Sequence, residues 1–553
     1  MATEGDGPAE GSNPETDPAA DARADYDYHG EDVERPGLVT DLRDRVAGDV
    51  RFDTYTRQLY ATDASAYEVT PIGVVFPTST ADVSAVVAYC ADRGIPVLPR
   101  GGGTSLAGQA VNEAVVLDFS RHMDGLVGVD PEARVATAEP GIRLGDLNAT
   151  IAEHGLKFAP DPAWGDKSAL GGAIGNNSTG SHSLQYGKTD AYVEELEVVL
   201  ADGTVTTLGE TPPEEIRERA DPEADAVLPR LYAQVVRIVD EERAEIARRY
   251  PDLKRNVSGY NLDVLIEEAR QAQDPEHDRE TVNLARLLAG SEGTLAVVTR
   301  ATVSLEPVPN TKAVALLTYD SLLDAMADVE PILAHDPAAL EVMDDVLLDL
   351  ARDTAEFADV VGTLPEGTDS VLLVEFYAAD DAEGRQRVAD LVADRVPGAE
   401  TEAAPSEGAG ETTGTECHAV QVLEAHDAET RARFWKMRKS GLPILLGRTT
   451  DEKHIAFIED TAVPAEHLPE YVADFQDVLD DHGTFACFYA HAGPGVLHIR
   501  PLINAKTAEG VEQMESIADA ATDLVVEYGG SVSGEHGDGR ARTQWNRKLY
   551  GEH

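Results

Sequence analysis

The chain has 553 residues, more than one hydrophobic core usually spans, so we expect at least two domains. Its 102 acidic residues against 45 lysines and arginines give a formal net charge of −57, which argues against nucleic acid or an anionic membrane surface as the main partner. The acids are spread along the whole chain, a pattern typical of surfaces adapted to high salt, and we therefore expect a halophilic, cytoplasmic protein.

Residues 1–36 contain few apolar residues and many acids, and they lack the basic start and apolar run of a signal peptide. We expect an acidic, disordered tail there. No run of about 18 apolar residues occurs, so the sequence predicts no transmembrane segment. The cysteines Cys90, Cys417 and Cys487 lie far apart, which excludes an iron–sulfur cluster held by this chain's cysteines alone and indicates no disulfide framework.

From Pro71 onward, short strands and helices alternate. Residues 79–94 predict a helix that Ser79 or Thr80 caps and Gly94 ends. Short apolar runs bounded by turn residues predict strands at 72–77, 95–100, 114–119, 134–141, 196–203 and 295–307.

The stretch GGGTSLAGQ, residues 101–109, follows the strand that ends at Arg100. A Rossmann loop would open a helix, but the residues after it predict another strand, so we reject that interpretation. What remains is a run of bare backbone amides beside an arginine, a nest suited to an anion such as a pyrophosphate. An ordinary glycine-rich turn is the alternative.

Two more glycine-rich loops follow, at 160–187 and at 290–293, and their small residues allow the backbone to lie against a flat ligand. Between them, residues 212–283 form a charged, mostly helical insertion. After Pro307 the pattern changes: strands such as 313–319 and 370–377 alternate with amphipathic helices. We expect a domain boundary near residues 307–309.

In this order, PRGGGTSLAGQ, GGAIGNNSTGSHSLQYGKTD, ELEVVLADG and GSEGTLAVVT resemble the FAD domain of the vanillyl-alcohol oxidase/p-cresol methylhydroxylase flavoproteins. Within them the chain is similar to the FAD-linked D-lactate, glycolate and D-2-hydroxyglutarate dehydrogenases. The resemblance runs from about Asp63 to the C-terminus, apart from the insertion. It implies an α+β fold: a two-part FAD-binding domain of the p-cresol methylhydroxylase type at 37–308, and an α+β substrate (cap) domain with an antiparallel sheet at 309–553. Relatives usually continue further, so we expect the cap to be truncated at its C-terminus.

The resemblance also implies FAD as cofactor, with the pyrophosphate cradled after Arg100, the flavin along the second loop and the third loop closing the site. The expected FAD-binding residues are Arg100, Gly101, Gly102, Gly103, Thr104, Ser105, Leu106, Pro160, Asp161, Gly171, Gly172, Gly175, Asn176, Asn177, Ser178, Gly180, Ser181, Gly290, Glu292, Gly293 and Thr294. Some relatives attach the flavin through a histidine where this chain has Thr104, so we expect non-covalent FAD.

The carboxy-terminal part predicts a hairpin, with strands at 484–491 and 496–502 around a Gly-Pro-Gly turn. If His491 pairs with Val496, His498 is its diagonal neighbour on the same face, close enough for two imidazoles to share one metal. The alternative is that the histidines only cap the hairpin. Glu535 would complete a set that leaves positions open for water or substrate. The resemblance selects the same three residues, with Pro494 as a departure, and we expect a divalent metal, zinc.

His536 is then available as a base, because a neutral imidazole accepts a hydroxyl proton near neutral pH. Its alternative role is to hold Glu535 in place. Arg438 and Lys453 match substrate-binding positions of the D-2-hydroxyglutarate dehydrogenases and would bind the substrate carboxylate, with surface salt bridges as the alternative. A preference for a dicarboxylate stays open.

These residues predict an FAD-dependent dehydrogenase that oxidises a D-2-hydroxy acid (D-lactate, glycolate or D-2-hydroxyglutarate) to the 2-oxo acid. Hydride would pass to flavin N5, and electrons would leave to a separate acceptor, which is an iron–sulfur protein, a quinone or a cytochrome. Two alternatives remain: a flavin oxidase that uses O2, and a non-catalytic flavin subunit of a larger redox complex.

Overall fold

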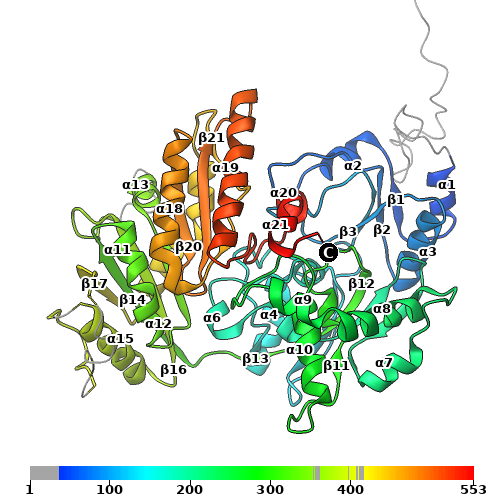
Figure 1. Ribbon diagram of the computed structural model, residues 1–553, viewed down its shortest axis with the longest axis horizontal. Helices are drawn as coiled ribbons and strands as arrows, with labels where there is room; N and C mark the ends of the chain where they lie inside the picture. The colour runs from blue at the N-terminus through cyan, green and yellow to red at the C-terminus, as the bar shows by residue number, and fades with distance from the viewer. Residues whose placement is uncertain are drawn as a thin grey trace, which may run out of the picture.

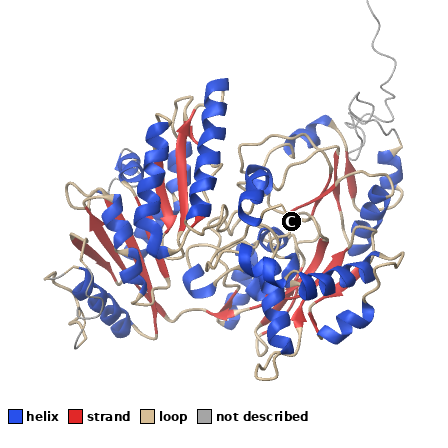
Figure 2. Ribbon diagram, viewed as in Figure 1, coloured by secondary structure: helices blue, strands red, loops and turns tan. Residues whose placement is uncertain are grey.

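The computed structural model describes residues 37–352, 354, 361–396, 398–406, 409 and 416–552, so the expected acidic tail at 1–36 lies outside the described residues. Two α/β halves lie side by side (Figure 1; Figure 2). The carboxy-terminal end of the chain, drawn in red, crosses back onto the amino-terminal half (Figure 1). We propose the limit between the halves at residues 308–309, where β13 (Glu306–Pro307) ends and the segment before β14 (Thr311–Tyr319) begins.

A four-stranded sheet opens the amino-terminal half. Its strands are, in order, β1 (Asp49–Arg51), β2 (Gly73–Phe76), β4 (Val115–Asp118) and β3 (Val97–Arg100). β3 and β2 run parallel to β4, and β1 is antiparallel to β2. The covering helices are α1 (Leu38–Arg43), α2 (Thr54–Leu59) and α3 (Thr80–Ala91). Ser79 caps α3 by accepting a hydrogen bond from the Asp82 N–H, as predicted. The loop after Arg100 joins two strands, which confirms the strand–loop–strand interpretation.

A second sheet of five antiparallel strands completes this half. Its strands are β5 (Leu126–Asp130), β6 (Val135–Ala138), β12 (Val297–Ser304), β8 (Val193–Val199) and β9 (Val205–Leu208). The α-helices of this region, including those of the insertion, are α4 (Leu144–Ile151), α5 (Leu170–Asn176), α6 (Ser183–Tyr186), α7 (Pro213–Arg219), α8 (Val227–Glu241), α9 (Arg243–Arg249) and α10 (Leu262–Gln273). The short remaining elements are η2 (Ala152–His154), β7 (Leu156–Lys157), η3 (Thr189–Tyr192), β10 (Glu210–Thr211), β11 (Val282–Asn283) and η4 (Arg286–Leu288).

The carboxy-terminal half is built on one antiparallel sheet, as expected for the cap. Its strands are β17 (Gln421–Ala425), β14, β16 (Ser370–Ala378), β15 (Ala339–Met343), β20 (Ala486–His491), β21 (Val496–Ile503) and β18 (Lys453–His454), with β19 (Thr461–Ala462) also on β21. One face packs against α11 (Leu322–Ala327), α12 (Val329–Leu333), α15 (Asp381–Arg395), α18 (Leu468–Asp481) and α19 (Ala508–Glu527). The other packs against α13 (Asp345–Arg352), α16 (Ala428–Lys439) and α17 (Gly441–Leu446).

Side-chain alternation along these strands sets up a polar corner of the cap. Leu340, Ala490 and Leu497 belong to the first core face. Because neighbouring residues of a strand point to opposite faces, Glu341, His491 and His498 share the other face. After α19, the chain forms α20 (Gly539–Arg542), η6 (Thr543–Trp545) and α21 (Asn546–Tyr550); η5 (Ala465–His467) precedes α18. Among the described helices, none is both long and apolar enough to span a bilayer.

Candidate active site

A pocket opens between the three glycine-rich loops of the amino-terminal half. It is lined by Gly101–Ser105 from the first loop, by Gly171, Gly172 and Gly175 of α5, and by Glu292 and Gly293 from the third. Among the described residues, the backbone N–H groups of residues 101–106 donate to no protein acceptor. A run of unpaired amides at a pocket wall suits an anion, because several N–H donors are available to one ligand.

The glycines of this pocket fit an extended cofactor. A Cβ built on Gly172 or Gly175 would meet no atom within 4 Å, so both residues leave their side of the pocket open. A Cβ on Gly102 would instead overlap the carbonyl oxygen of Lys167, which means that the first and second loops pack backbone against backbone at this point. The residues present therefore fit a pyrophosphate and the flat ring system attached to it.

Thirteen of the expected FAD-binding residues line the pocket: Arg100, Gly101, Gly102, Gly103, Thr104, Ser105, Gly171, Gly172, Gly175, Asn176, Ser178, Glu292 and Gly293. Eight do not: Leu106, Pro160, Asp161, Asn177, Gly180, Ser181, Gly290 and Thr294. Some of these have evident structural partners. The Asp161 carboxylate lies 3.2 Å from His182 Nδ1, and the buried Asn177 side chain accepts from the Asp190 N–H at 2.8 Å.

The Arg100 guanidinium supports the first glycine-rich loop through hydrogen bonds. It donates to the carbonyl oxygens of Ala110 at 2.6 Å and Thr62 at 2.9 Å. Gly103 lies directly over it with a left-handed φ of 63°, where a Cβ would come 2.5 Å from Arg100 Nη2. Arg100 thus holds the loop that presents the free amides, and its charge lies at the pocket wall.

The histidine hairpin forms as predicted. His491 of β20 pairs with Val496 of β21, and Tyr489 pairs with His498. The two imidazole centroids are 5.0 Å apart. This diagonal placement confirms that both histidines face the same side of the sheet.

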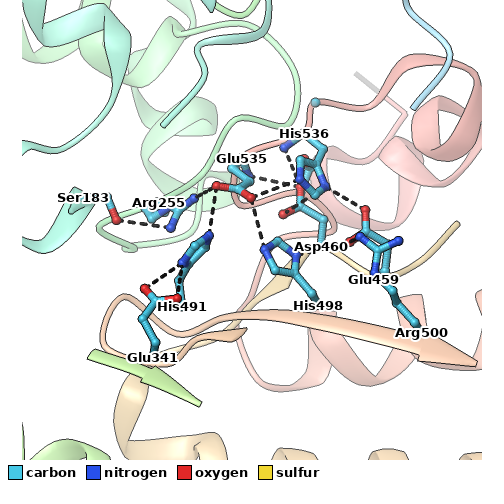
Figure 3. A network of polar contacts seen from close by, with 12 residues as sticks. Ser183, Arg255, Glu341, Glu459, Asp460, His491, His498, Arg500, Glu535 and His536 are labelled. Carbon is cyan, nitrogen blue, oxygen red and sulfur yellow. Dashed lines mark hydrogen bonds and ion pairs between the residues drawn. The ribbon is translucent and has the colours of Figure 1, made fainter. Parts of the chain in front are cut away.

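Glu535 lies where three histidines converge (Figure 3). Its Oε1 is 3.1 Å from His498 Nε2 and 3.0 Å from His536 Nε2, and its Oε2 is 3.4 Å from His491 Nε2. Arg255, which is fully buried, also pairs with Oε2. Against the opposing effect of burial, the electrostatic influence of His491 and Arg255 foremost holds the pKa of Glu535 well below its usual range. The sequence motifs predicted Glu535, His491, His498 and His536 as site residues, and the fold brings these four together.

The motifs did not indicate three buried acids of this site, of which two contact the outer nitrogens of the rings and the third holds the backbone of residues 535 and 536. Glu341 of β15 contacts His491 Nδ1 at 2.8 Å. Glu459 contacts His536 Nδ1 at 2.7 Å and lies 3.2 Å from His498 Nδ1. Asp460 accepts from the backbone N–H groups of Glu535 and His536. Such outer contacts fix the tautomer and direction of an imidazole. Each acid stands within or beside an apolar run, the one sequence signal that could have marked it.

The electrostatics of the cluster favour protonated imidazoles. The carboxylates of Glu459, Asp460 and Glu535 outweigh the opposing effect of burial and raise the pKa of His536 to about 10. Hydrogen bonds to Glu459 and Glu535 likewise raise the pKa of His498. Without another cation, these rings therefore supply the positive charge that the acids require.

The same donor set fits a divalent cation. Asp460, His498, Glu535 and His536 each offer a ligand atom, and these atoms lie within 4.8 Å of one another. Asp460 Oδ1 is buried and accepts no hydrogen bond among the described residues. The expected set of His491, His498 and Glu535 also converges on one carboxylate. Imidazole and carboxylate donors suit zinc.

The two expected substrate-binding cations lie apart. Arg438 of α16 is buried beside the cluster, with Nη2 2.7 Å from Glu341 Oε2, and its Nε has no hydrogen-bond partner among the described residues. Lys453 of β18 pairs with Ile503, at the end of β21 far from His498, and donates to the Arg448 carbonyl. The structure thus brings Arg438 to the cluster and does not bring Lys453 there.

The pocket and the cluster meet at the loop around His536. Gln109, which lines the pocket, donates from Nε2 to the His536 carbonyl oxygen at 2.6 Å. The Arg540 N–H donates to the Ala107 carbonyl at 2.8 Å. The histidine cluster of one half is therefore anchored directly to the glycine pocket of the other.

Comparisons with known proteins agree with this geometry. Residues 71–209 match the model of an FAD binding domain, and residues 308–553 match that of the C-terminal domain of FAD linked oxidases. The D-2-hydroxyglutarate dehydrogenase of Pantoea ananatis is 31% identical over 91% of this chain and 48% of its own length, so the chain spans about half of that relative.

The glycolate oxidase subunit GlcD of Bacillus subtilis is 27% identical over 91% of this chain and 88% of its own. The solved structure of 4-ethylphenol oxidase from Gulosibacter chungangensis, with an isoeugenol ligand, matches with a TM-score of 0.59 at 15% identity, over 90% of this chain and 89% of that one. This likeness confirms the predicted fold class.

Proposed function

The chain belongs to the FAD-linked oxidases, and we propose that it is an FAD-dependent dehydrogenase that oxidises a D-2-hydroxy acid to the 2-oxo acid. The observation that carries the proposal is the direct anchoring of the His536 loop to the glycine pocket through Gln109. The histidine cluster and the glycine pocket therefore meet at one junction, which supports the proposal because an alcohol oxidation needs a proton acceptor beside its hydride acceptor. Relatives named D-2-hydroxyglutarate dehydrogenase and glycolate oxidase subunit support a 2-hydroxy acid as substrate.

The residues would divide the work as follows. Bound FAD would supply the acceptor for the hydride that leaves carbon 2 of the substrate. Arg438 would bind the substrate carboxylate, and its unpartnered Nε supports this role. His536 would accept the hydroxyl proton at Nε2, because Glu459 holds its Nδ1 and a cation bound at Glu535 would take the carboxylate oxygen that lies 3.0 Å from Nε2.

A divalent cation on His491, His498 and Glu535 would polarise the substrate hydroxyl and offset the local negative charge. That compensation matters for His536, because the surrounding carboxylates raise its pKa to about 10 and a protonated ring cannot act as a base. We propose non-covalent FAD, since Thr104 carries no group that forms such a link. We also propose that electrons pass to a separate acceptor; the relative from Bacillus subtilis is itself named as a subunit.

The test is anaerobic mixing of the FAD-loaded protein with a panel of D- and L-2-hydroxy acids, in high salt, followed by the visible absorbance of the flavin. We expect D-lactate, D-2-hydroxyglutarate or glycolate to bleach the flavin and L-acids to leave it oxidised. His536→Ala should keep bound FAD but slow bleaching by about 10²–10⁴-fold, the range for general-base loss. His277→Ala, an exposed histidine of the amino-terminal half, is the matched control.

Bleaching by L-acids alone, or full speed in His536→Ala, would contradict the proposal. Readmitting air separates the oxidase alternative, because an oxidase recovers its oxidised spectrum rapidly whereas a dehydrogenase recovers slowly. Bound FAD that no acid bleaches would instead favour a non-catalytic flavin subunit.

A further inference from the structure

Gln109 occupies the junction between the glycine pocket and the loop that carries His536. All of its amide atoms are used. Its Oε1 accepts from the Ser105 hydroxyl, and its Nε2 donates to Glu292 Oε1 at 3.0 Å and to the His536 carbonyl at 2.6 Å. A flipped amide would place its oxygen against two acceptors, so the hydrogen-bond pattern allows one orientation only.

Glu292 completes the same connection from the third glycine loop. Its carboxylate accepts from the Gly539 N–H, at 3.2 and 3.1 Å to its two oxygens. Its own N–H donates to the Gly175 carbonyl at 2.8 Å, so the residue is tied to the second loop as well. Glu292 has a left-handed φ of 52°, a strained conformation for a side-chain-bearing residue that persists only where surrounding contacts enforce it.

The His536 loop leaves no room for adjustment at this point. Gly537 has a φ of 79°, and a Cβ there would come 2.7 Å from Gln109 Nε2 and overlap the Glu292 carboxylate. A Cβ on Gly539 would overlap the Ala107 carbonyl. Gly537 and Gly539 are thus required because this backbone lies directly against Gln109, Glu292 and the first loop.

We propose that Gln109 is a positioning residue that couples occupancy of the glycine pocket to the placement of His536. The inference deepens the proposed function and rests on it. Ser105, which lines the pocket, holds the Gln109 oxygen, so a cofactor that fixes residues 101–105 also fixes the amide that donates to His536. Glu292 receives the second N–H of the same amide and ties the arrangement to Gly175. Gln109 contacts the backbone of His536 and acts only through it.

The test separates the placement of His536 from the binding of FAD. Gln109→Ala should still bind FAD fully at a saturating concentration, and dithionite should reduce that bound FAD normally. Reduction by the D-2-hydroxy acid should slow at least tenfold, because only that step depends on His536. Gln273→Ala, an exposed glutamine of α10, should change neither rate. A substrate-driven rate within twofold of normal in Gln109→Ala would overturn the proposal.

An exchanged pair distinguishes donation to His536 from simple pairing with Glu292. In Gln109→Glu combined with Glu292→Gln, the two side chains again form a hydrogen bond, but a carboxylate now faces the His536 carbonyl. We expect the thermal midpoint of this double variant to return to that of the unaltered protein, above those of the two single variants. Its substrate-driven rate should stay low. Recovery of both would assign Gln109 a purely structural role.

A readout independent of turnover is hydrogen exchange of the backbone amides at 534–541. FAD should slow the exchange of these amides in the unaltered protein, and most of that protection should be lost in Gln109→Ala. If no acid bleaches the unaltered protein yet this protection appears and depends on Gln109, the proposed function fails and the coupling stands. Equal protection in both proteins would contradict the coupling.

Discussion

One buried carboxylate, that of Glu459, contacts four side chains of the active-site cluster. It lies 2.7 Å from His536 Nδ1, 3.2 Å from His498 Nδ1, and within 3.3 Å of the guanidinium groups of Arg500 and Arg542. Its neighbours, led by His536, hold the pKa of Glu459 well below its usual range despite full burial. The charge of this one residue therefore sets the direction of both rings.

Glu459→Gln tests this role. The amide keeps the size but cannot accept from all four donors, so His536 should lose its fixed direction. We expect the substrate-driven reduction of FAD to slow by about 10–100-fold, the usual cost of removing such an orienting contact, with FAD affinity unchanged. Glu466→Gln, an exposed glutamate seven positions along, is the matched control. Rapid-mixing absorbance measures both, and an unchanged rate in Glu459→Gln would rule the role out.

The sequence motifs identified His491, His498, Glu535 and His536 because those residues stand in recognisable local patterns. Glu341 and Glu459 carry no such pattern, and Gln109, although it ends the first glycine motif, was not among the expected site residues. Each reaches the site from a different part of the chain, and the distance between them depends on strand order and on how the halves meet. The spacing of residues along the sequence gives no information on strand order or on how the halves meet. Lys453 shows the converse: it follows the motif, yet β18 holds it at the far end of β21.

At the scale of elements, the glycine loops and the cap sheet do different work. The loops present unpaired amides and open space, whereas the sheet directs alternate side chains to one corner. Short apolar runs bounded by turn residues predicted many of the strands, and the Gly-Pro-Gly turn predicted the pairing of β20 with β21, since adjacent strands joined by a tight turn have one natural register. It could not place β15 between β16 and β20, which brings Glu341 beside His491.

Gly172→Ala tests the pocket without disturbing the fold. A Cβ there meets no protein atom within 4 Å and projects into the open side of the pocket, so the apoprotein should unfold at an unchanged or slightly higher temperature, since alanine favours a helix over glycine. FAD affinity should fall about tenfold or more, because the methyl group takes space that the cofactor needs. Fluorescence titration with FAD measures this, and Gly128→Ala on β5 is the control, with equally open surroundings. Equal affinity in the two variants would place FAD elsewhere.

Asp344 predicts a pH dependence that belongs to one element. It precedes α13, accepts from the Leu347 N–H, and also accepts from the Phe488 N–H of β20 at 2.5 Å. Burial raises its pKa to about 7. The folded state then binds a proton that the unfolded chain has already released, so this group's contribution to stability falls as pH rises from about 4 to about 7.

In Asp344→Asn that fall should disappear. The difference in free energy of unfolding between Asp344→Asn and the unaltered protein should therefore move in favour of the variant from pH 5 to pH 8, whatever its offset from changed hydrogen bonding. Denaturant unfolding at several pH values provides the comparison. A difference that stays constant across this range would contradict the raised pKa.

At the scale of the whole molecule, buried ion pairs hold the two halves together, whereas repulsion between surface charges destabilises the folded protein. His182 of the amino-terminal half lies 3.2 Å from Asp161 and 2.9 Å from Glu375 of β16, and Trp435 donates to the same Glu375 at 2.6 Å. Hydrogen bonds to both carboxylates raise the pKa of His182. The net charge of −57 acts in the opposite direction, because like charges repel across the surface.

Salt should therefore stabilise this protein strongly. The screening length shortens from about 10 Å at 0.1 M salt to about 3 Å at 1 M, which removes most of the repulsion between exposed acids. We expect the thermal midpoint to rise steadily with KCl in that range. A parallel series in sucrose, which does not screen charge, should give a smaller rise. Equal responses to KCl and sucrose would argue against the halophilic character that we propose from composition.

The most direct test of the account is a crystal structure of the FAD-loaded protein soaked with a zinc salt and a D-2-hydroxy acid. We expect the pyrophosphate against the amides of residues 101–106, the flavin ring facing His536, and an anomalous zinc peak beside His498 and Glu535. A flavin ring turned away from His536, or FAD bound outside the glycine pocket, would contradict it.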